Sequence, residues 1–95
     1  MRLERSQAAL ADLDDIWWYV ASDSEAMADK LIERLVSAVE RLADFPYMGV
    51  AREDLAAGLR ALSIDNYVAF YRVLSDVVMI ERVLHARMNA TRKAF

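Results

Sequence analysis

The chain has 95 residues, of which 57% are apolar, a net charge of −3 and no cysteine. This length fits one domain over residues 1–95, and the lack of cysteine excludes disulfides and thiol chemistry. A general nucleic-acid binder is usually basic, so we expect no direct, specific nucleic-acid binding from the chain alone.

The charge is divided unevenly along the chain. Residues 1–58 carry 12 acids and 6 bases, whereas residues 59–95 carry 3 acids and 6 bases.

The start of the chain has no apolar core typical of a signal peptide, and the longest apolar run, residues 16–21, is too short to span a bilayer. We therefore expect a cytoplasmic protein that does not engage a membrane.

The first half of the chain predicts an edge strand and two helices. Residues 2–5 form the strand, and Ser6 is a candidate N-cap for a helix over 7–21. A second amphipathic helix is predicted over 23–45, with Ser22 and Glu25 as its capping box and Pro46 after its end. The short link makes the two helices an antiparallel hairpin.

The second half predicts three strands and a basic tail. The strands cover 59–64, 67–74 and 77–85, the tail covers 86–95, and two-residue turns join the strands at residues 65–66 and 75–76. The order β-α-α-β-β-β predicts a two-layer α+β fold, in which the helical hairpin packs on a small antiparallel sheet.

Strand alternation assigns the side chains to two faces of this sheet. With both turns two residues long, Arg60 and Arg82 lie on the face toward the helices. The opposite face is predicted to be open and to carry Val68, Phe70, Arg72, Met79, Glu81, Val83 and His85. An error of one residue in either turn would exchange the faces of the strands beyond it.

Four motifs occur in order along the chain. They are S-x-x-A-x-x-D-L-x-x-I-W-x-Y from Ser6, P-x-x-G-x-x-R-x-D-L-x-x-G-L-R from Pro46, Y-V-A-F-Y-R-V from Tyr67 and I-E-R-V-L-H-x-R from Ile80. Together they resemble the ParE branch of the RelE/ParE toxins of bacterial type II toxin–antitoxin systems. The resemblance implies a non-catalytic inhibitor of DNA gyrase, held in a hetero-oligomer by a tightly bound ParD-like antitoxin.

The other branch of this family, which RelE represents, suggests an alternative. A ribosome-dependent mRNA endoribonuclease would use Glu81, His85 and Arg87 as its acid/base and phosphate-binding groups. The basic residue that such nucleases place after the tyrosine of the middle strand is absent, because Val68 follows Tyr67. A third alternative is a degenerate toxin that only binds antitoxin.

Several side chains are candidates for contacts with these partners. Trp18 lies on an otherwise polar helix face and is predicted to contact a partner or to pack under the amino-terminal strand or the tail. The open sheet face, extended by Arg87, is a predicted landing surface for the antitoxin. The basic tail, with Arg87, Arg92 and Lys93, is either a gyrase-poisoning element or a solvated terminus.

Charged residues at the helix–sheet boundary predict a structural ion pair. Asp12 borders the buried stripe of the first helix, and its predicted partner is Arg82 or Arg60. Arg72 is expected to meet Glu81 or a partner. No zinc-ligand or P-loop spacing occurs, so no metal or cofactor is expected.

Overall fold

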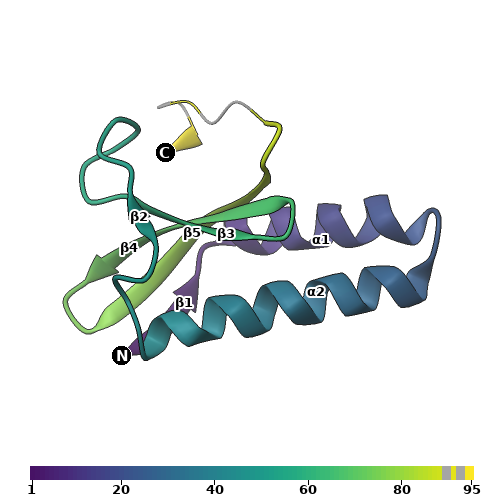
Figure 1. The fold of residues 1–95 in the computed structure, drawn as a ribbon, viewed down its shortest axis with the longest axis horizontal. Coiled ribbons are helices and arrows are strands. Elements are labelled where there is room, and N and C mark those ends of the chain that lie inside the picture. Colours follow the sequence, from purple (N-terminus) through teal and green to yellow (C-terminus); the bar gives the residue numbers. More distant parts are fainter. Residues whose placement is uncertain (89–90, 92–93) are drawn as a thin grey trace.

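The computed structural model describes residues 1–88, 91, 94 and 95. The elements are β1 (Arg2–Arg5), α1 (Gln7–Ala21), α2 (Glu25–Glu40), a 3-10 turn η1 (Arg41–Ala43), β2 (Val50–Ala51), β3 (Arg60–Ile64), β4 (Tyr67–Leu74) and β5 (Val77–His85). The helical hairpin covers one face of the sheet (Figure 1). The predicted α+β class is therefore confirmed. Among the described residues, no helix is long and apolar enough to cross a membrane.

The three long strands of the sheet are antiparallel, as predicted, but the edge strand β1 makes the sheet mixed. Its strand order is β1-β5-β4-β3-β2, and β1 lies parallel to β5 whereas the other pairs are antiparallel. The two-residue strand β2, which the sequence did not predict, pairs with Ala61 and Arg60 at the opposite edge.

Serine hydroxyls define where both helices begin. Ser6 Oγ accepts the Ala9 N–H at 3.0 Å and donates to the Glu81 carbonyl at 2.7 Å, which ties the start of α1 to β5. Ser24, not Ser22, caps α2 by accepting the Met27 N–H. The predicted capping box is wrong because Ser22 ends α1 and its hydroxyl donates to the Tyr19 carbonyl.

The second helix is shorter than the predicted range of 23–45. It ends at Glu40 and continues as η1, whose 3-10 geometry tightens the chain before Pro46.

The inner face of the hairpin packs on the sheet in one large core. Its fully buried members include Leu35, Tyr71 and Val78.

Both hairpins close with the predicted two-residue turns. Asp65 and Ser75 adopt φ of 54°, the left-handed conformation that such turns require. The β3–β4 register follows directly, with Ile64 opposite Tyr67.

A β-bulge shifts the second hairpin by one residue. Tyr71 lies opposite Ile80 but Phe70 lies opposite Arg82, so Glu81 is the additional residue on β5. Beyond the bulge the two faces are exchanged relative to the prediction. Val83 therefore lies in the helix-facing core and Leu84 on the outer face.

The outer face of the sheet is covered rather than open. Leu55 and Leu59, from the segment between β2 and β3, pack on Phe70 and Leu84 in a second small core. The Phe95 ring lies 4.9 Å from the Phe70 ring and adds to this cover. In Figure 1 the β2–β3 segment and the carboxyl terminus lie on the side of the sheet opposite the helices.

Candidate functional site

The helical hairpin carries two strongly exposed aromatic side chains near its tip. Trp18 is 65% exposed and Tyr19 is 79% exposed. Trp17 meets Trp18 edge to face at 5.0 Å, and the Trp17 indole N–H donates to Asp29 on α2 at 2.8 Å. Trp18 is thus exposed to solvent while its ring packs on Trp17, and tryptophan is one of the residues most enriched at the hot spots of protein interfaces.

Asp12 pairs with Arg82, the first of its two predicted partners. Its carboxylate accepts two hydrogen bonds of 2.8 Å from the guanidinium and one of 2.9 Å from the Val83 N–H. These hydrogen bonds raise the pKa of Arg82 above its ordinary value, against the opposing effect of burial. The pair fixes α1 to the bulged part of β5.

Arg60, the alternative partner, holds a loop instead. Its Nη2 donates to the carbonyl oxygens of Tyr47 and Gly49 at 3.1 and 2.6 Å, and its guanidinium lies over the Tyr47 ring. Tyr71 holds the same loop, because its hydroxyl donates to the Pro46 carbonyl and accepts the Gly49 N–H. The predicted Asp12–Arg60 pair is therefore wrong.

The bulge separates Glu81 from His85, two of the three residues of the nuclease alternative. Glu81 pairs with Arg72 on the outer face, where Arg72 also donates to the Ala57 carbonyl. His85 lies on the helix side, with its ring 5.1 Å from the Tyr67 ring. The prediction that Glu81 and His85 share one face is wrong, and Arg72 is not a free cation.

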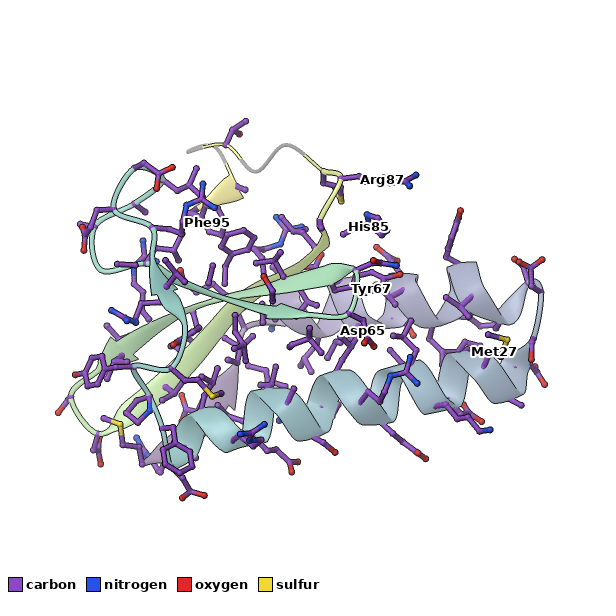
Figure 2. The ribbon with its side chains drawn as sticks, viewed as in Figure 1. Met27, Asp65, Tyr67, His85, Arg87 and Phe95 are labelled. Atoms are coloured by element: carbon purple, nitrogen blue, oxygen red, sulfur yellow. The ribbon has the colours of Figure 1, made fainter. Side chains whose placement is uncertain are left out.

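His85 does lie next to Arg87, as Figure 2 shows. The Arg87 backbone N–H donates to His85 Nδ1 at 3.0 Å, and both residues line an open pocket of about 570 Å³ between α1 and β5. Tyr19 and Tyr67 line the same pocket, and burial together with the nearby Tyr19 raises the pKa of Tyr67. The pocket thus brings together one imidazole, two phenols, and the paired Asp12 and Arg82 beside Arg87 and Asp15.

The predicted landing surface on the sheet is largely enclosed. Phe70 is 3% exposed and Val83 is 2% exposed, so neither is available to a partner in this conformation. Val68 packs against the second small core, and Met79 is half-buried. The prediction of an open apolar face is wrong because the β2–β3 segment and Phe95 occupy it.

The basic tail is described only in part. Arg87 is exposed at its start. Arg92 and Lys93, the other two predicted members of a gyrase-poisoning element, lie outside the described residues. Within the described part of the chain, no group of three or more His, Cys, Asp or Glu side chains is arranged to hold a metal ion.

The structure also reveals a basic groove that was not predicted from the sequence. Its cations are Lys30, Arg34 and Arg41, which face the end of β3. The polar positions of α2 were assigned no role from the sequence. The spacing of the three cations did predict a shared side, because Arg34 and Arg41 follow Lys30 by four and eleven residues, and such steps return to nearly the same side of a helix.

Known proteins share this geometry and much of the sequence. The chain matches the family described as "ParE toxin of type II toxin-antitoxin system, parDE" over residues 3–90. The chain belongs to the ParE toxin family. The match covers the hairpin, the sheet and the Arg87 region.

Individual ParE relatives agree with the family assignment. Toxin ParE1 of Caulobacter vibrioides is 45% identical over 87 residues, which cover 90% of this chain and 88% of the relative. Toxin ParE1 of Mycobacterium tuberculosis is 34% identical, and the match covers 92% of this chain and 91% of the relative. A chain from the solved "Chromosomal ParDE TA system from P. aeruginosa" has a TM-score of 0.78 and 28% identity, covering 90% of this chain and 95% of that one.

Proposed function

We propose that this ParE family member inhibits bacterial DNA gyrase by binding it and is neutralised by a ParD-like antitoxin in a cytoplasmic hetero-oligomer. The observation that carries the antitoxin proposal is the exposed, rigidly supported Trp18 on the helical hairpin of a ParE fold. A solved relative comes from a ParDE system, which supports the same class of partner. The gyrase proposal is supported by the family assignment.

The nuclease alternative finds less support in the arrangement of side chains. Glu81 is engaged by Arg72 on the outer face, while His85 faces the helices. A nuclease needs its acid, base and phosphate-binding groups around one phosphate. His85 and Arg87 alone do not form that set.

The decisive experiment is a supercoiling assay with purified gyrase and toxin freed from antitoxin. We expect loss of supercoiling or accumulation of cleaved DNA, reversed when antitoxin is added. Normal gyrase activity at excess toxin would reject the gyrase proposal. Antitoxin binding without any effect on gyrase or mRNA would identify a degenerate toxin.

Two single variants separate inhibition from nuclease chemistry. We expect Arg87→Ala to weaken gyrase inhibition, because Arg87 is an exposed cation at the start of the tail, and His85→Ala to leave it unchanged. Dose–response curves in the supercoiling assay measure both effects. Loss of ribosome-dependent mRNA cleavage in both variants, with no gyrase effect in either, would support the nuclease alternative instead.

Trp18→Ala should weaken antitoxin binding by about tenfold or more, because an aromatic anchor at an interface contributes at least about 1–2 kcal/mol. The matched control is Phe45→Ala. Phe45 is an aromatic residue of similar exposure, at 59%, and it follows η1, far from the hairpin tip where Trp18 lies. Titration calorimetry of each variant against antitoxin gives the comparison. Equal losses in the two variants would show that Trp18 has no special role.

A further inference from the structure

An open groove of about 600 Å³ runs between α2 and the end of β3. Its lining from α2 and η1 holds the cations Lys30, Arg34 and Arg41, which are all the cations of that segment, and the acid Glu33. Ile64 contributes an apolar wall, and Asp65 lies above α2 at the end of the β3–β4 hairpin (Figure 2). Three cations against the two acids Glu33 and Asp65 leave the groove with an excess of one positive charge, in a half of the chain that is acidic overall.

The cations of this groove are only partly neutralised. Arg34 pairs with Asp65 at 2.8 Å, but both side chains are about half exposed, at 57% and 45%. In the part of the chain that the structure describes, neither Lys30 nor Arg41 takes part in an ion pair. An exposed pair such as Arg34–Asp65 exchanges readily with a competing carboxylate, since water and salt screen its attraction.

The sheet edge beside the groove has unused backbone groups. The two-residue turn makes Ile64–Tyr67 a hydrogen-bonded pair, so the N–H and C=O of Ser63 point away from β4. Strand β2 covers this edge only at Ala61 and Arg60, and Ser63 is exposed. An extended segment could therefore continue the line of β2 along β3.

We propose that the groove binds an extended acidic segment of the antitoxin, which pairs with β3 at Ser63 and sets carboxylates against Lys30, Arg34 and Arg41. This inference rests on the proposed antitoxin partner and adds a second contact, distinct from the one at Trp18. The spacing of carboxylates on the bound strand suits the spacing of cations on α2. Alternate residues of a strand lie about 7 Å apart, and cations one helical turn apart, such as Lys30 and Arg34, lie about 6 Å apart.

Two variants with opposite expected signs test the charge contacts. Asp65→Asn frees Arg34 and should tighten antitoxin binding about two- to fivefold. Asparagine keeps the left-handed turn conformation that Asp65 adopts, at φ 54°. The combined variant Lys30→Gln, Arg34→Gln and Arg41→Gln should weaken binding about tenfold or more and flatten its salt dependence. Arg2→Gln, at an exposed cation on the far edge strand, is the matched control and should change nothing.

The probe is the antitoxin protein titrated into the full-length toxin at low and high salt, with hydrogen exchange of the Ser63 amide followed in parallel. Protection of that amide together with the opposite affinity changes would support the proposal. If every variant binds antitoxin equally and Ser63 stays unprotected, the groove is not used, although the proposed function stands. If the wild-type toxin does not bind antitoxin at all, the proposed partner fails and this inference fails with it.

Discussion

Replacing Asp12 with alanine should lower the free energy of unfolding by about 3–5 kcal/mol, because it leaves the Arg82 guanidinium without its partner. The Asp12 side chain is 11% exposed and that of Arg82 is 28% exposed, so water compensates poorly for the loss. The Val83 N–H also loses its acceptor. Such a change is a large fraction of the stability of a small domain, which is about 5–15 kcal/mol.

Denaturant unfolding followed by circular dichroism measures this effect. The matched control is Asp14→Ala, at an exposed acid on the same helix, which should change stability by less than about 0.5 kcal/mol. In a double-mutant cycle, removing Arg82 as well should cost much less than the sum of the two single losses. Additive losses would show that the pair does not stabilise the fold.

Gly49→Ala should destabilise the protein by about 3 kcal/mol, since the new methyl group has no space and breaks existing hydrogen bonds. A Cβ on Gly49 would lie 2.7 Å from the Ala61 carbonyl oxygen and 2.7 Å from the Tyr71 hydroxyl. Tyr71 is fully buried and cannot move aside. The methyl group would therefore displace the loop that Tyr71 and Arg60 hold.

The other glycine provides the control for this substitution. A Cβ added at Gly58 would meet nothing within 4 Å, so there is space for a side chain. Glycine is favoured at this position only because its φ of 73° lies in the left-handed region. Gly58→Asn should thus cost at most about 1 kcal/mol, because asparagine tolerates this conformation. Thermal unfolding ranks the two variants. A Gly49→Ala protein as stable as Gly58→Asn would mean that the loop moves without cost.

The turns and helices of this fold were predictable because their signals are local. Asp65-Asn66 and Ser75-Asp76 are residues that favour left-handed turns, and they set both hairpins. The bulge at Glu81 had no such signal. Glu81 and Arg82 are both polar while Val83 and Leu84 are both apolar, so either register places one apolar residue on each face.

The candidate site was predictable to a similar extent. Helical periodicity places Asp12 at the border of the buried stripe and Trp18 on the opposite face, and both positions agree with the structure. The choice of Arg82 rather than Arg60 as the partner of Asp12 did not follow from it. The enclosed outer face did not follow from it either, because Leu55 and Leu59 lie in a segment without regular secondary structure. Only the folded chain shows that this segment returns across the sheet.

The parallel pairing of β1 with β5 has a consequence for how the toxin is made. Ser6 is hydrogen-bonded to Glu81, which is 75 positions away, and β5 lies between β1 and β4 in the sheet. The first strand to leave the ribosome therefore has no partner until the last strand follows, and closing so long a loop delays folding. Synthesis interrupted before β5 yields helices without a complete sheet. The complete five-stranded sheet, and every surface that depends on it, therefore forms only after the last strand has been made.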